Sequence, residues 1–176
     1  MQIGVARRVI TPTGSINMAG YGYRDHPSEG VYQDLLATVL LLEDDGAKVV
    51  LLHTDLLYFD HTMARRIEIA IKERTGLTSD ELILTATHTH CGPAIRQMDG
   101  VRHGPLDEPY LDWMVSQLAD ATNEAISNTE NAQLYHGVGK CEININRRLK
   151  TPDGVMLRPN PDGAVERKVD VVKAVD

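Results

Sequence analysis

The order of apolar and amphipathic segments most constrains how this chain of 176 residues can fold. Two apolar runs, residues 34–43 and 48–57, flank Asp44-Asp45-Gly46, and this turn sequence predicts a β-hairpin. The periodicity of the following residues predicts four further elements: a helix over 60–76, a strand over 81–88, a helix over 108–128 and a long strand over 131–148. The alternation of strands and helices favours an α/β fold, with a mixed sheet, βαβ crossovers and flanking helices.

Both helical segments carry start signals, and the first also carries a stop signal. Asp60 or Thr62 can cap the start of the first helix, and Gly76 can end it. Asp107 or Glu108 precedes a proline in the first turn of the second helix. The buried face of each helix is predicted from residues at helical spacing: Met63, Ile67, Ala70 and Ile71 in the first, and Leu111, Val115, Leu118, Thr122 and Ala125 in the second.

Polar residues follow three of the predicted strands. If these strands are parallel neighbours, their carboxyl ends lie at one edge of the sheet, where sites form in open α/β folds. Asp55 ends the first strand, His88 and His90 end the second, and Asn146 and Arg147 end the third. The sequence therefore predicts that three separated polar groups converge. The last strand could instead run antiparallel, which would remove the third group.

The histidine pair lies in the segment ILTATHTHCGP, residues 83–93. Side chains two apart on a strand point to the same side, so His88 and His90 are expected to face one cleft. Thr87 and Thr89 would then face the other way. Neutral imidazole is a good Zn²⁺ ligand, which favours a metal-binding or catalytic role. The alternative is a pair of hydrogen-bonded histidines in the core or at its rim.

Other polar residues also allow a functional and a structural interpretation. Asp55 could orient a ligand histidine or bind substrate, or it could be a helix cap or part of an ion pair. Arg147 could hold a carboxylate or an oxyanion in a bidentate contact, or it could lie on the surface. Gly20, Tyr21 and Gly22 could line a substrate or oxyanion site, or they could form a simple tight loop.

Composition and charge narrow the functional classes. The net charge of −7 argues against nonspecific nucleic-acid binding, which needs a basic surface. No run of about 18 apolar residues is present, so no transmembrane helix is predicted. The N-terminal sequence MQIGVARRVITP does not resemble a signal peptide, so a cytoplasmic protein is expected. A processed secreted protein would also lack its signal.

Five stretches, taken in order, resemble one protein family. They are ITPTGSINMAGYGYR, GVYQDLLATVLLLEDDG, LLHTDLL, ELILTATHTHCGP, and NINRRL followed by PDG. This set resembles the N-terminal part of the neutral/alkaline non-lysosomal ceramidases and their bacterial relatives. Thr-His-Thr-His-x-Gly-Pro is its most specific piece. The sequence departs from the family at Cys91, where serine is usual, and in showing no signal peptide of the kind found in secreted ceramidases.

The resemblance implies a zinc-dependent amide hydrolase. In that family Zn²⁺ activates water to attack the N-acyl amide of a sphingolipid, which gives sphingosine and a fatty acid. By this resemblance His88 is a zinc ligand and His90 lies beside the substrate. Asp55 and Arg147 correspond to functionally important residues. The expected substrate is a lipid-like N-acyl amide, either ceramide or a related compound.

The same resemblance implies that the site is incomplete. The family's remaining zinc ligands (a second histidine, a glutamate and a tyrosine) and its active-site serine belong to sequence beyond Asp176. A catalytic zinc needs about three protein ligands and an open position. Residues 1–176 are therefore expected to be the N-terminal portion of a ceramidase-like catalytic domain, truncated before its C-terminal half. Alone, this portion is expected to be weakly active or inactive.

Two other functions remain open. A different His-x-His metal hydrolase, such as an amidohydrolase barrel, is disfavoured because no further strand-end ligands recur at regular intervals. The other is a non-catalytic binding or assembly domain with structural histidines, in which exposed strand edges would promote self-association. Zinc binding that requires His88 would support an enzyme over such a domain.

Overall fold

The computed structural model describes residues 1–96 and 104–175, which form two compact units, Met1–Asn131 and Ala132–Asp176. The described residues of the first unit form five strands, two α-helices and one short 3-10 helix. Its elements, in chain order, are β1 (Gln2–Val9), β2 (Leu36–Asp44), β3 (Ala47–Thr54), α1 (His61–Thr75), η1 (Ser79–Glu81), β4 (Leu82–Ala86), α2 (Glu108–Ser127) and β5 (Thr129–Asn131).

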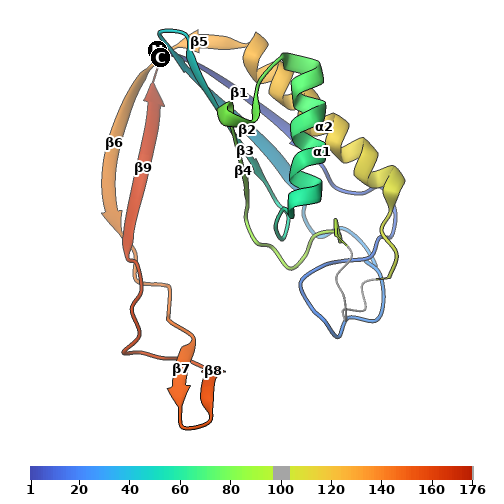
Figure 1. Cartoon of the computed structure of the whole chain (residues 1–176), viewed down its shortest axis with the longest axis vertical. Coiled ribbons are helices and arrows are strands. Elements are labelled where there is room, and N and C mark those ends of the chain that lie inside the picture. Colours follow the sequence, from blue (N-terminus) through green and yellow to red (C-terminus); the bar gives the residue numbers. More distant parts are fainter. Residues whose placement is uncertain (97–103, 176) are drawn as a thin grey trace. The chain divides into compact units, whose positions relative to one another are not determined.

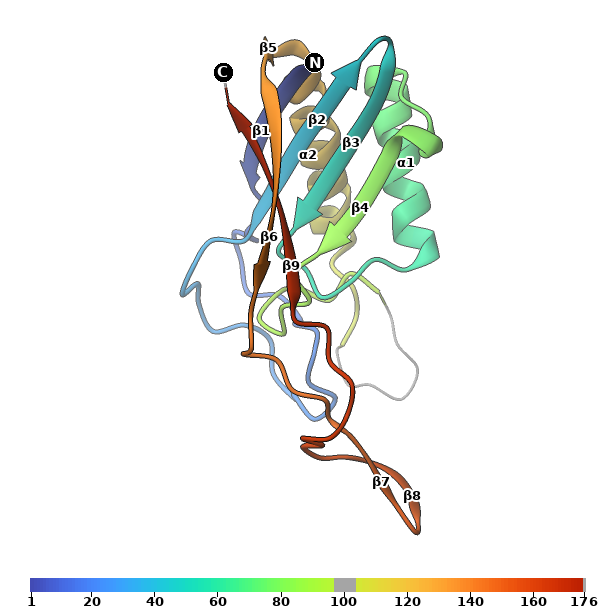
Figure 2. The same cartoon turned by 90° about the vertical axis from the view of Figure 1, so that its left-hand side faces the viewer.

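The five strands form one mixed sheet in the order β4-β3-β2-β1-β5 (Figure 2). The predicted hairpin is confirmed, since β2 and β3 are antiparallel and Asp44 pairs with Ala47 across the two-residue turn. β4 is parallel to β3, and α1 makes the crossover between them. The α/β class is therefore confirmed, with one βαβ unit in the first unit's sheet.

The two helices cover the same face of the sheet (Figure 1). Asp60 caps α1 by accepting from the backbone N–H of Met63 at 2.8 Å, and Asp107 caps α2 by accepting from Tyr110 at 3.0 Å. Both caps agree with the sequence signals. The predicted helix faces pack on alternate residues of the central strands, and the largest fully buried side chains include Leu41, Leu52, Ile67, Ile71, Leu111 and Leu118.

The sequence did not predict β1, an interior strand that lies between β2 and β5. Its buried side is made of Gly4 and Ala6, so it lacks the large apolar residues that mark a strand. Gly4 is small for a packing reason, because a Cβ at this position would lie 1.8 Å from the carbonyl oxygen of Ala125 in α2. The close approach of helix and strand therefore excludes a side chain there.

The strands after α2 follow the antiparallel alternative that the sequence left open, and no third parallel neighbour forms among the described residues. The chain instead forms the short strand β5, which pairs antiparallel with β1 at the opposite edge of the sheet from β4. β1 already occupies the position beside β2, and β5 adds to the free edge of β1. The single long strand expected over 131–148 is also broken, and residues 141–147 are irregular.

The second unit consists of two antiparallel pairs. β6 (Gln133–Lys140) pairs with β9 (Lys168–Val175), and β7 (Arg148–Thr151) forms a hairpin with β8 (Gly154–Leu157). Most residues of these strands are exposed. Across the described residues of both units, neither helix is long and apolar enough to cross a membrane.

Candidate functional site

The histidine pair lies in the loop that follows β4. The strand ends at Ala86, and the backbone of His88 has a φ of +64°, so the expectation that the strand reaches His88 is wrong. A non-glycine residue with positive φ is uncommon and turns the chain sharply. Two backbone hydrogen bonds hold the loop against the chain after β3: Thr87 donates to Thr54 at 3.0 Å and Thr89 donates to Leu56 at 3.2 Å.

His88 is held through one ring nitrogen. Its Nδ1 lies 2.8 Å from the backbone carbonyl oxygen of Leu57. A carbonyl can only accept a hydrogen bond, so in the neutral imidazole Nδ1 carries the proton and Nε2 keeps its lone pair. His88 is exposed, which leaves this lone pair open to a ligand.

The ring of His90 lies between two other rings. Its centroid is 5.3 Å from that of His88 and 5.1 Å from that of Tyr21, and both contacts are edge-on, with interplanar angles of 70° and 73°. The two histidines therefore lie side by side. The turn at His88 produces this arrangement in place of the predicted strand pleat.

The segment carrying Tyr21 is attached to the histidine loop by backbone contacts. Met18 forms an antiparallel bridge with Pro93, and Ala19 donates to the carbonyl of Gly92 at 3.0 Å. Gly20 has a φ of +103°, and a Cβ there would lie 2.6 Å from Cβ and Cγ of His90. Only glycine fits both the conformation and the contact.

The three residues expected to bind substrate therefore differ in their surroundings. The structure places Gly20 and Tyr21 against His90. A Cβ at Gly22, by contrast, would meet no atom within 4 Å. This difference has no local signature in the sequence, because it depends on a contact with a loop about 70 residues away in the chain.

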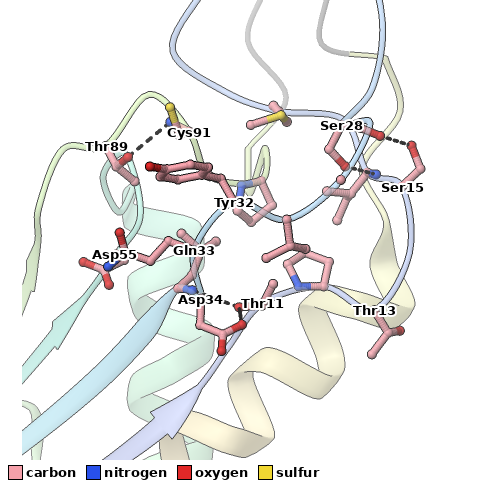
Figure 3. Close-up of a pocket in the computed structure, with 18 of the residues that line it drawn as sticks. Thr11, Thr13, Ser15, Ser28, Tyr32, Gln33, Asp34, Asp55, Thr89 and Cys91 are labelled. Carbon is pink, nitrogen blue, oxygen red and sulfur yellow. Dashed lines mark hydrogen bonds between the residues drawn. The ribbon is translucent and has the colours of Figure 1, made fainter.

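A pocket of about 860 Å³ opens on the other face of the histidine loop. Thr87, Thr89 and Cys91 line it, together with Asp55 and the segments 11–16 and 28–35. Figure 3 shows Asp55, Thr89 and Cys91 on one side of the pocket, with Ser15 and Ser28 across from them. Of the residues that the structure describes, the lining includes neither histidine, so the loop separates a histidine side from a pocket side.

Asp55 lies on the pocket side of this loop. One carboxylate oxygen accepts a hydrogen bond from the backbone N–H of Leu36 at 2.9 Å, and the backbone N–H of Asp55 donates to the carbonyl of Leu36 at 2.8 Å. The side chain thus fastens the end of β3 to the start of β2. This is a structural role, and a catalytic role for Asp55 stays a prediction.

Arg147 belongs to the second unit, in the irregular segment before β7, and it is exposed. The neighbouring Asn146 organises this segment: its side chain accepts from the backbone of Arg148 at 2.8 Å and donates to the carbonyl of Ala164 at 2.9 Å. Arg147 does not follow a parallel strand of the first unit's sheet, since the preceding strand β6 pairs antiparallel with β9 in a separate sheet. Its functional role therefore stays a prediction that rests on the family resemblance.

The donors on the histidine side fit part of a zinc site. His88 offers a free Nε2, and His90 places a second imidazole beside it. Within residues 1–96 and 104–175, no group of three or more His, Cys, Asp or Glu side chains could hold a metal ion. These residues can therefore supply some of the three protein ligands that a catalytic zinc requires.

Sequence reasoning missed Arg24, which contacts both loops on the histidine side. Its guanidinium donates to the carbonyl of Ala19 at 3.1 Å and to the carbonyl of His90 at 3.3 Å. The only signal in the sequence was the position of this arginine in the glycine- and tyrosine-rich stretch NMAGYGYR. That stretch does not reveal a contact with the distant histidine loop.

The fold and this loop define an α/β domain that presents a histidine pair at the carboxyl end of two parallel strands. The chain belongs to the neutral/alkaline non-lysosomal ceramidase family, since residues 1–152 match the N-terminal part of that family.

Known relatives match almost the whole chain. The neutral ceramidase of Pseudomonas aeruginosa is 24% identical over 194 aligned residues, which cover 99% of this chain and 28% of the relative. The fold matches a crystal structure of neutral ceramidase from Pseudomonas aeruginosa with a TM-score of 0.83 at 22% identity, covering 99% of this chain and 29% of that one. A structure of ceramidase complexed with C2 matches with a TM-score of 0.82 at 21% identity and the same coverage. The chain thus spans less than a third of the length of these relatives.

Proposed function

We propose that residues 1–176 supply the N-terminal part of the active site of a zinc-dependent hydrolase of N-acyl amides. The proposed reaction is that of a ceramidase, in which ceramide or a related lipid amide yields a sphingoid base and a fatty acid. Membership of the ceramidase family supports this reaction class. The match to a solved neutral ceramidase supports a shared fold.

The hydrogen bond between His88 and Leu57 carries the proposal. It fixes the neutral imidazole as the tautomer with the proton on Nδ1. The distance between Nδ1 and the carbonyl oxygen of Leu57 is 2.8 Å. Metal-binding histidines in proteins usually donate their second ring nitrogen in this way, which orients the ring and raises its basicity. We therefore assign Nε2 of His88 as the zinc ligand of this chain.

When bound, Zn²⁺ would lower the pKa of a water molecule and polarise the amide carbonyl. His90, whose ring is packed against His88 and Tyr21, is assigned to contact the substrate beside the metal. Arg147 is assigned to hold an anionic group of the substrate or reaction intermediate, because a guanidinium can make two parallel hydrogen bonds to such a group. Asp55 is assigned a supporting role, because its side chain joins the end of β3 to the start of β2.

The site also needs residues that this chain does not bring together. The described residues contain no group of three metal-binding side chains, and the chain covers 28% of the curated relative. We therefore propose that residues 1–176 act as one portion of a larger catalytic domain. Alone, the chain is expected to hydrolyse a fluorogenic N-acyl sphingosine weakly or not at all.

A chimera tests this function directly. In the Pseudomonas aeruginosa neutral ceramidase, the segment matched by this chain is replaced with residues 1–176, and hydrolysis of a fluorogenic N-acyl sphingosine is measured. The chimera is expected to turn over substrate, and His88→Ala is expected to reduce turnover to background. The matched control is His136→Ala, which removes an exposed histidine of the second unit and should leave turnover near that of the parent.

Three outcomes would contradict the proposal. A chimera that folds and contains zinc but hydrolyses no amide would contradict the assigned reaction. A chimera that keeps its turnover in His88→Ala would contradict the assignment of His88 as a zinc ligand. A third result, full turnover and one zinc per molecule in the isolated chain, would show that the site is complete and would refute the claim that this portion is insufficient.

A further inference from the structure

We propose that Arg24 is a positioning residue that fixes the ring of His90 beside His88. Arg24 joins the two loops of the histidine side through its planar guanidinium. Nη1 donates to the carbonyl of Ala19 at 3.1 Å, and Nη2 donates to the carbonyl of His90 at 3.3 Å. One side chain therefore ties the backbone of His90 to the segment that packs against its ring.

The same guanidinium also holds the aromatic neighbour of His90. Its Cζ lies 5.1 Å from the centroid of the Tyr21 ring, within the range of a cation–π contact. The backbone N–H of Arg24 donates to the carbonyl of Tyr21 at 3.2 Å, so a turn brings the arginine back over that ring. The Tyr21 ring in turn meets His90 edge-on at 5.1 Å.

Arg24, Tyr21, His90 and His88 thus form a continuous series of contacts. The ring of His90 is in edge-on contact with both Tyr21 and His88. Gly20 also restricts the His90 side chain, because its backbone lies so near His90 that no Cβ would fit. Arg24 is the member of this series that contacts both loops, through Ala19 and His90, so its loss should loosen His90 more than the rest of the fold.

Arginine suits this place better than lysine. Its planar fork offers several donors in fixed directions, so two carbonyls and a ring face can be engaged at once. Lysine has a single ammonium group that can retain the charge over the ring but cannot span both carbonyls in the same geometry. The conservative variant Arg24→Lys is therefore expected to keep part of the effect, and Arg24→Met is expected to keep none.

The test uses nuclear magnetic resonance of the full chain labelled with ¹⁵N-histidine. The measured quantities are the ring signals of His90 and the nuclear Overhauser effect between the rings of His90 and Tyr21. His53 is the internal reference, because its Nδ1 has a separate partner in Thr85 Oγ1 at 2.9 Å. Gly20→Ala serves as a positive control, since its Cβ must displace His90.

Arg24→Met should reduce the Overhauser effect between Tyr21 and His90 by at least about half and shift the His90 signals, with the His53 signals unchanged. Arg24→Lys should give an intermediate loss. Unchanged His90 signals and an unchanged Overhauser effect in Arg24→Met would overturn the proposal. If Arg24→Met also shifts His53, the protein has changed globally, and Arg24→Lys decides: a partial loss at His90 alone supports the proposal, and no loss refutes it.

The inference depends on the proposed function only for its catalytic consequence. The orientation of His90 is measured without zinc or substrate, whereas the proposed function is tested by turnover of the chimera. Reorientation of His90 in Arg24→Met together with an inactive chimera would leave the positioning role standing and refute the hydrolase assignment. An unchanged orientation of His90 in Arg24→Met together with an active chimera would refute the role of Arg24 and leave the hydrolase assignment intact.

Discussion

At the residue scale, the carbonyl of Leu57 determines which nitrogen of His88 is free. The two residues lie 31 positions apart in the chain and meet because β3 and β4 are parallel neighbours. The positive φ of His88 turns its ring toward that carbonyl. Neither the partner nor the turn has a signature in the sequence THTH, which accounts for the wrong prediction that the strand reaches His88.

Asp55 allows structural and catalytic roles to be separated by substitution. Asp55→Ala leaves the backbone N–H of Leu36 without its acceptor, and it should lower the free energy of unfolding by about 1–3 kcal/mol. Asp55→Asn keeps an oxygen acceptor and should change stability by less than about 0.5 kcal/mol. Urea denaturation of both variants measures the difference.

Turnover of the chimera then tests whether Asp55 has a catalytic role. If the carboxylate charge takes part in the reaction, Asp55→Asn should lose turnover while remaining as stable as the parent. Equal stability of Asp55→Ala and Asp55→Asn would contradict the structural role assigned to the hydrogen bond with Leu36.

At the scale of elements, the fold depends on the close packing of α2 on β1. Gly4→Ala would place a Cβ 1.8 Å from the carbonyl oxygen of Ala125, so helix and strand must separate. We expect a loss of about 1–3 kcal/mol in the free energy of unfolding, measured with urea.

Gly14→Ala is the matched control for this change. A Cβ at Gly14 would meet no atom within 4 Å, so the same substitution should alter stability by less than about 0.5 kcal/mol. If Gly4→Ala were as stable as Gly14→Ala, the described contact between β1 and α2 would be wrong.

The elements differed in how well the sequence predicted them. Both α-helices and the hairpin were predicted because caps, periodicity and turn residues act locally. β1 was missed because the close approach of α2 selects small residues on its buried side. The partner of β5 was also missed, because the position of a strand in a sheet depends on which neighbours are already present.

At the scale of the whole molecule, the core belongs to the first unit. Every buried hydrophobic residue of the described chain lies at or before Ala125, and the strands of the second unit are mostly exposed. A two-stranded ribbon without a hydrophobic layer is marginally stable in water. Cooperative unfolding of the chain should therefore report on Met1–Asn131.

A fragment of residues 1–131 tests this division. It should unfold cooperatively in urea, with a midpoint within about 0.5 M of that of the full chain, because it keeps all five strands and both helices of the packed unit. Hydrogen exchange of the full chain provides a second readout, in which β6 and β9 should exchange before β2 and β3. A fragment without a cooperative transition would contradict the assignment of the core.

The assignment of His88 Nε2 as a zinc ligand is tested by a zinc titration of the metal-free chimera, in which the Pseudomonas aeruginosa portion restores the ligands that residues 1–176 do not bring together. The ring nitrogens of ¹⁵N-labelled histidines are followed as Zn²⁺ is added, in the parent and in His88→Ala. We expect the Nε2 signal of His88 to shift, Nδ1 to keep its proton, and the strongest response to disappear in His88→Ala. A titration in which His88 does not respond, or in which zinc binding is unchanged by His88→Ala, would contradict the assignment.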